Sequence, residues 1–260
     1  MSVVAVASVR SCGVTTLATG LAMVWPAGGR RLVVEVDPGG GTIAATAGLP
    51  AAPGLISLAA AARRGDDPER LFEHCQSLNN GGTLVLCAPP GRERARSAVA
   101  MLVGLFRRLG ELDAEVFLDC GRLEGDTPTF ELFEKADLAL LAVRPQLADL
   151  NALASFLEIR ESAVRRQTVV LVGAGPYPPA EVADALGIDV AGHFPSDCET
   201  AQALTTAPVG SRHFTRTPLV RALRTLAGDL GQRLGASSAP PCQPPEAVSS
   251  NGHASSGMHQ

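Results

Sequence analysis

The sequence predicts a doubly wound α/β domain, in which helices flank a mostly parallel central sheet. Three observations predict it. Short and almost continuously apolar segments recur along the chain, helical patterns separate them, and 46% of the 260 residues are hydrophobic, enough for one large core. Strands that are apolar on both faces are typical of a parallel sheet covered by helices on both sides. The alternation of strand and helix favours right-handed crossovers.

Seven segments are expected to form strands. They are rich in valine, leucine and alanine and lack polar alternation, and the seventh has the weakest pattern. They span residues 3–7, 31–37, 83–88, 114–120, 137–143, 168–174 and 188–194. The lack of alternation places these strands in the centre of the fold rather than against solvent.

Five segments between and after these strands carry a helical pattern. They span residues 15–25, 93–109, 147–165, 179–186 and 217–234. The last one repeats leucine at helical spacing, which indicates one buried face. Residues 235–260 are mostly Ser, Pro, Gly and Ala and cannot bury a core, so we expect a domain over residues 1–234 and a disordered tail over residues 235–260.

Charge and cysteine content narrow the class of protein. The net charge is -4, whereas a dedicated nucleic-acid binder usually carries a concentrated basic surface. The six cysteines form no C-x-x-C pair, so we expect reduced thiols in a cytoplasmic protein and neither a zinc nor a haem site. No uninterrupted apolar stretch approaches the ~18 residues of a membrane span, so no transmembrane segment is expected.

The segment "SVRSCGVTT", which begins at Ser8, follows the first predicted strand and opens the first predicted helix. A phosphate-binding loop reads G-x-x-x-x-G-K-[ST]. Gly13 and Thr15 match this pattern, but Ser8 replaces the first glycine and Val14 stands at the lysine. Backbone N–H groups and the helix N-terminus can still attract phosphate without that lysine. The alternative is a plain strand-to-helix turn with Thr15 as a helix cap.

Acidic residues end two of the predicted strands. Glu35 and Asp37 end the second strand, before "PGGG", and Asp119 ends the fourth. Ligands of open α/β sheets bind beyond the carboxyl ends of the strands, so these carboxylates stand where a magnesium–nucleotide site would have them. The alternatives are solvated strand ends for Glu35 and Asp37, and a turn cap for Asp119.

Five segments in the same order resemble the MinD/ParA family of P-loop ATPases, over roughly residues 2–234. Besides the loop and the two acidic strand ends, they include "LLAVRPQLADL" and "HFPSD". The family's loop reads KGGxGKTT. Val9 therefore stands at the signature lysine that reaches the partner's nucleotide in the family's dimer, and Val14 stands at the lysine that holds the β- and γ-phosphates.

The resemblance also implies a role for each site residue. Asp37 would help to place the attacking water, and Asp119 matches the aspartate of the Walker B strand, so these two would be the catalytic residues of an active enzyme. Magnesium would be held by Thr15, Glu35 and Asp119. ATP, bound weakly or not at all, would contact the loop residues Arg10, Ser11, Cys12, Gly13, Val14, Thr15 and Thr16.

Three functions are compatible with these residues. The first is a degenerate MinD/ParA-like protein, for which the resemblance implies that a homodimer is possible. It positions or regulates a partner machine for chromosome partitioning, secretion, pili or polarity, with little or no ATP hydrolysis. The second is an active ATPase with an unconventional loop that uses Arg10 and Asp37. The third is a DNA-associated partition factor whose last helices contact phosphate through arginines. Losing one preorganised donor typically lowers a rate by roughly 10²–10³, which favours the first.

Overall fold

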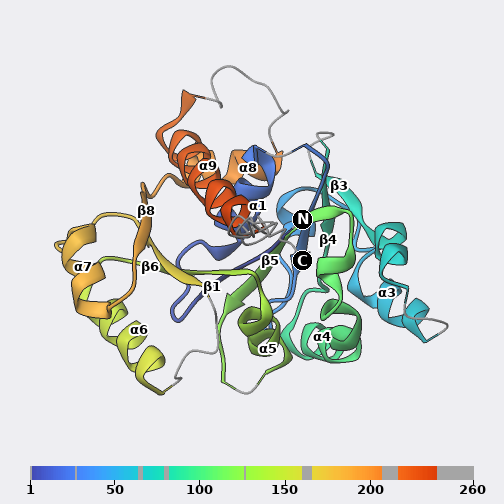
Figure 1. The fold of residues 1–260 in the computed structure, drawn as a ribbon. Helices are drawn as coiled ribbons and strands as arrows, with labels where there is room; N and C mark the ends of the chain where they lie inside the picture. Colours follow the sequence, from blue (N-terminus) through green and yellow to red (C-terminus); the bar gives the residue numbers. More distant parts are fainter. Residues whose placement is uncertain are drawn as a thin grey trace, which may run out of the picture.

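The protein, seen in a computed structural model, is built around an eight-stranded sheet (Figure 1). The structure describes residues 2–26, 28–63, 67–78, 82–125, 127–159, 166–206 and 216–238. In the order β3-β4-β2-β5-β1-β6-β7-β8, the strands are Gln76–Leu78, Thr83–Leu86, Arg30–Glu35, Ala114–Arg122, Val3–Ser8, Leu138–Val143, Gln167–Val172 and Val190–Phe194. Only the edge strand β3 runs antiparallel to its neighbour, so the predicted mostly parallel sheet is confirmed.

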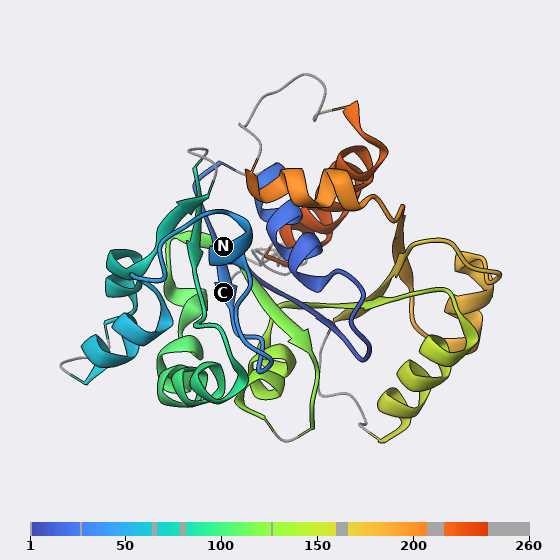
Figure 2. The same cartoon turned by 180° about the vertical axis from the view of Figure 1, so that it is seen from behind.

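Helices cover both faces of the sheet in a three-layer arrangement (Figures 1 and 2). On one face lie α1 (Val14–Val24), α8 (Cys198–Thr206) and α9 (Pro218–Ser238), and α1 contacts both of the others. The opposite face carries α3 (Leu55–Ala62), α4 (Arg92–Phe106), α5 (Pro128–Lys135), α6 (Leu147–Ile159) and α7 (Pro179–Leu186). A short helix, α2 (Ile43–Thr46), follows β2, and 3-10 turns span Pro68–His74 and Leu109–Glu111.

Two cores, one on each face of the sheet, explain why the strands lack polar alternation. Along β1, Val4 and Val6 pack into the core beneath α1, α8 and α9, whereas Ala5 and Ala7 pack into the opposite core. All four side chains are fully buried. Every position of such a strand has to be apolar, as a parallel sheet between two helical layers requires.

All seven predicted strands and all five predicted helices are present, with shifted ends. The sequence patterns missed β3, which has three residues, and the helices α2, α3, α5 and α8. In α3 the repeated alanines of "LISLAAAA" conceal the helical period. Helix α9 continues to Ser238, and residues 239–260, most of the expected tail, lie outside the described residues. No helix in the described part of the chain is long and apolar enough to cross a membrane.

Candidate functional site

A cavity of about 310 Å³ opens where β1, β2 and β5 end. Neighbouring strands hold the three ends together, because β5 pairs with both β1 and β2. This volume is at the lower end of small-molecule sites, roughly 300–1,000 Å³. The lining comes from four segments of the chain and consists of Ser8, Ser11, Cys12, Gly13, Val14, Thr15, Asp37, Gly39, Thr42, Arg92, Gly121, Arg122 and Glu124.

The loop between β1 and α1 keeps the geometry of an anion cradle. Gly13 adopts a left-handed conformation (φ 89°), and its carbonyl accepts the first helical bond from the Leu17 amide at 3.0 Å. No described side chain caps α1, so its first amides are left for another acceptor. The Ser8 hydroxyl is fully buried, lines the cavity and has no hydrogen-bond partner among the described residues.

The side chains at the two family lysine positions pack into the protein's own cores. Val14, the first residue of α1, is only 5% exposed and packs into the core between α1 and the sheet, although it also borders the cavity. Val9 is partly buried and packs against the opposite core. The loop's one cation, Arg10, lies 3.7 Å from Asp149 at the start of α6 and does not line the cavity. The geometry therefore does not support the expected contact between Arg10 and phosphate. Thr16 also lies outside the cavity lining.

Both carboxylate oxygens of Glu35 are occupied by backbone donors. One oxygen accepts the amides of Thr42 (2.8 Å) and Ile43 (2.9 Å), and the other accepts the amide of Ala88 (2.9 Å). Burial raises the pKa of Glu35, and these three bonds oppose that rise. Glu35 thereby ties the end of β2 to the loops after β2 and β4. Neither Glu35 nor Asp119 is part of the cavity lining, but Glu35 has no free carboxylate oxygen, so the geometry does not favour it as a magnesium ligand.

Asp119 is paired with Glu35 across β5 and β2 but has a different environment. Its Oδ1 accepts the Gly121 amide at 3.2 Å, and its Oδ2 has no partner that meets hydrogen-bond geometry among the described residues. Burial raises the pKa of Asp119 to about 7, the Thr15 hydroxyl lowers it, and Glu35 and Asp37 raise it further. A buried and half-satisfied carboxylate beside a threonine hydroxyl fits a divalent cation or a proton.

Asp37 lies directly over the backbone of Gly121. A Cβ atom on Gly121 would stand 2.0 Å from the Asp37 carboxyl carbon, and the φ of +59° at Gly121 also favours glycine. Asp37 accepts the Gly39 amide at 2.6 Å, and burial raises its pKa while Arg122 and Arg92 lower it. Asp37 thus borders the cavity, as predicted for a residue that places water.

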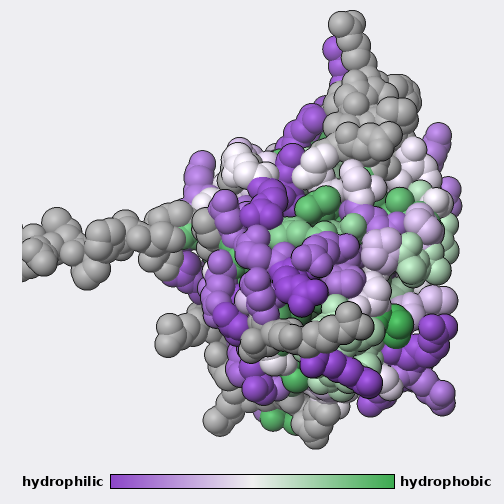
Figure 3. All heavy atoms as spheres, turned by 90° about the vertical axis from the view of Figure 1, so that its right-hand side faces the viewer, coloured by the Kyte–Doolittle hydropathy of each residue, from purple (hydrophilic) through white to green (hydrophobic). Residues whose placement is uncertain are grey.

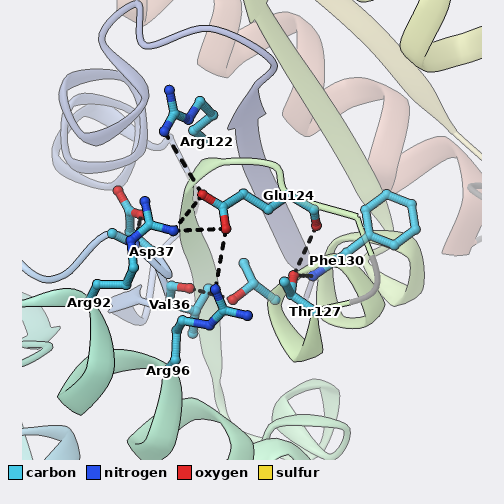
Figure 4. Close-up of polar contacts among 10 residues, drawn as sticks. Val36, Asp37, Arg92, Arg96, Arg122, Glu124, Thr127 and Phe130 are labelled. Atoms are coloured by element: carbon cyan, nitrogen blue, oxygen red, sulfur yellow. Dashed lines mark hydrogen bonds and ion pairs between the residues drawn. The ribbon is translucent and has the colours of Figure 1, made fainter.

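Three arginines surround Glu124 at the cavity, and the sequence patterns did not reveal this cluster (Figure 4). Arg92 donates to both carboxylate oxygens of Glu124, at 2.8 and 3.0 Å, while Arg96 lies at 3.4 Å and Arg122 at 3.9 Å. Arg92 and Arg122 line the cavity themselves, whereas Arg96 does not. One available signal was position: Arg92 opens a helix after "PPG", and Arg122 follows Gly121 directly after the Walker B-like strand.

Cysteines and surface arginines provide no second site. The five cysteines of the described residues, Cys12, Cys75, Cys87, Cys120 and Cys198, are free. No group of three or more His, Cys, Asp or Glu side chains in that part of the chain could hold a metal by itself. Arg107 pairs with Glu131 and Arg108 with Glu111 on the surface.

Comparison with known proteins identifies the fold. No protein-family model and no curated protein matches the sequence. Among solved structures, the ParA family ATPase from Chlorobium tepidum has a TM-score of 0.74 and 16% identity, over 88% of this chain and 98% of that one. The septum site-determining protein MinD with Mg-ADP, from Pyrococcus horikoshii, has a TM-score of 0.69 and 16% identity, over 90% and 99%.

A third structure, the MinC:MinD cell division complex of Aquifex aeolicus, has a TM-score of 0.66 and 15% identity, over 92% of this chain and 98% of that one. The three likenesses extend over almost the whole described domain, and the strand that contains Asp119 lies next to the strand that leads into the loop. The chain therefore has the fold of the MinD/ParA-like P-loop ATPases.

Proposed function

We propose that this protein positions or regulates a partner assembly by binding, with little or no ATP hydrolysis. The observation that carries the proposal is the loop around Gly13. It keeps the left-handed turn and the uncapped N-terminus of α1, while Val9 and Val14 pack into the cores at the positions of the two family lysines. Preorganised donors usually supply the largest part of transition-state stabilisation, so their loss lowers turnover more than binding.

The names of two solved neighbours support the proposal that this protein positions another protein assembly. One is named a septum site-determining protein, and another is a complex of MinD with MinC. By this analogy, the partner is a protein of a partitioning, secretion, pilus or polarity machine. We further propose that the chain acts in the cytoplasm and can form a homodimer. The net charge of -4 weighs against the DNA alternative.

We also propose that the cavity binds a magnesium–nucleotide weakly. The unpartnered Oδ2 of Asp119 and the hydroxyl of Thr15 are the groups that would hold magnesium, and the other ligands would come from phosphate and water, as is usual for this ion. Bound magnesium would neutralise phosphate charge. Glu35 is left out of this set because backbone amides occupy both of its oxygens.

The test is a steady-state ATP hydrolysis assay on the full chain, with Asp119→Ala as the control for contaminating ATPases. We expect no turnover above that control. Turnover of ~1 s⁻¹, which is within the ordinary enzyme range, together with its loss in Asp119→Ala, would favour the active ATPase instead. In that case, Asp37→Ala should be the next most damaging change, because Asp37 borders the cavity.

A further inference from the structure

We propose that the phosphate chain of the ligand is bound by Arg92 and Arg122, two cations that reach the cavity from outside the loop, and that Glu124 holds their place when the ligand is absent. This inference rests on the proposed retention of ligand binding at the cavity. It assigns the positive charge to the start of α4 and the end of β5, outside the phosphate loop.

The first argument is the charge balance of the lining. Val14 and Val9 provide no charge, and Arg10 does not line the cavity. Arg92 and Arg122 are the two cations of the described lining, and Asp37 and Glu124 are its two carboxylates. Guanidinium groups bind phosphate through paired N–H donors, so they can take over the task of a lysine with a different geometry.

The second argument is that the fold holds Arg92 in place. Gly40 and Gly41 let the loop after β2 pack against the loop after β4: a Cβ on Gly40 would stand 2.6 Å from the Gly91 amide, and one on Gly41 would stand 2.3 Å from the Ala88 carbonyl. The Gly41 amide also donates to Pro89 at 3.0 Å. Arg92, which follows Gly91, is therefore brought over Asp37 (Figure 4).

The third argument concerns the solvent exposure of the ion pairs that Glu124 makes with the two arginines. Arg92 and Arg122 are 48% and 52% exposed, and Glu124 is 29% exposed, so solvent weakens these ion pairs. The pairing with Arg92 lowers the pKa of Glu124, so it stays charged. A polyphosphate carries more charge than one carboxylate and can displace it. The buried, unpartnered Ser8 hydroxyl and the uncapped start of α1 then provide further donors at the cavity.

The experiment is calorimetric titration of the full chain with inorganic triphosphate, Mg-ADP, Mg-ATP and adenosine. The variants are Arg92→Gln, Arg122→Gln and Glu124→Gln, with Arg107→Gln as the matched control, because Arg107 pairs with Glu131 outside the cavity. We expect triphosphate and Mg-ADP to compete for one site and adenosine not to bind. Each cavity arginine variant should weaken binding at least fivefold, Glu124→Gln should strengthen it at least threefold, and Arg107→Gln should change it less than twofold.

Unchanged affinity in both Arg92→Gln and Arg122→Gln would overturn the inference, and so would binding of nucleotides without binding of triphosphate. A wild-type protein that binds none of the phosphates would overturn it as well. The proposed function fails on a separate measurement, the appearance of Asp119-dependent ATP turnover. Arginine-dependent binding together with such turnover would therefore sustain this inference while rejecting the proposed function.

Discussion

Glu35 and Asp119 are buried carboxylates on neighbouring strands, paired in the sheet, and each is 1% exposed. Three backbone amides saturate Glu35, whereas Asp119 accepts one amide and leaves an oxygen without a described partner. A buried carboxylate whose oxygens all accept hydrogen bonds stabilises the fold. A buried carboxylate with an unpaired oxygen lowers the stability of the fold unless a ligand binds to it or a proton neutralises it. Burial and residue type alone therefore do not separate a carboxylate that is fully bonded within the fold from one that keeps a free oxygen.

The largest expected effect comes from removing the fully bonded carboxylate. Glu35→Ala leaves the buried amides of Ile43 and Ala88 and the part-buried amide of Thr42 without an acceptor, at ~1–3 kcal/mol each, so the free energy of unfolding should fall by about 3 kcal/mol or more. Urea-induced unfolding of the wild-type protein and the variant measures this fall in the free energy of unfolding. Asp119→Asn, the matched change on the other strand, should cost less than half as much. Equal losses in both variants would remove the distinction between the two acids.

The second effect is a pH dependence that belongs to Asp119. Its folded pKa, about 7, is raised above the unfolded value, so its contribution to stability is full below about pH 4 and is lost as the pH rises through 7. Relative to Asp119→Asn, the wild-type protein should lose up to about 4 kcal/mol of unfolding free energy between pH 4 and 8. Urea unfolding across this range measures the difference. Parallel curves for the two proteins would show that Asp119 has an ordinary pKa.

The smallest effect concerns the loop and tests whether the cradle still accepts phosphate. Val14→Lys should raise the affinity for magnesium–nucleotide at least tenfold, which requires ~1.4 kcal/mol, because Val14 borders the cavity. Loss of the buried valine should lower stability by about 1.5 kcal/mol. Calorimetry and urea unfolding measure the two changes, with Val14→Met as an uncharged control. A change in affinity below twofold in a folded protein would mark the loop as a structural turn.

The location of a partner surface is not evident from hydrophobicity. Figure 3 shows one side of the molecule, where hydrophobic residues are interspersed among hydrophilic ones. Four large apolar side chains are exposed in the described part of the chain, Ile56, Met101, Leu147 and Ile159, and they belong to three different helices. Single exposed apolar residues are ordinary on protein surfaces. Partner capture is therefore best sought with the intact chain rather than with a peptide from one helix.

The architecture was predictable from the sequence alone. Continuous apolar strands such as β1 and β6 specify a parallel sheet covered on both faces, since each strand has to satisfy two cores. The sequence also determined the place of the site, because Gly13, Asp37 and Asp119 stand at strand ends that a parallel sheet brings to one edge. Elements without a clear period, such as α3, or with very few residues, such as β3, were missed because local pattern carries little information there.

The contacts of the candidate site residues came only from the folded arrangement of the chain. Glu35 is fastened by Ala88, which is 53 positions away, and Arg92 meets Glu124 across 32 positions. Contacts of this kind depend on how loops pack, and no local period records them. For the same reason, Arg10, the one cation of the loop, is held by Asp149, while Arg92 and Arg122 reach the cavity. The physical reason is that charge acts through space, so a site can receive its cations from any strand end that the fold brings to it.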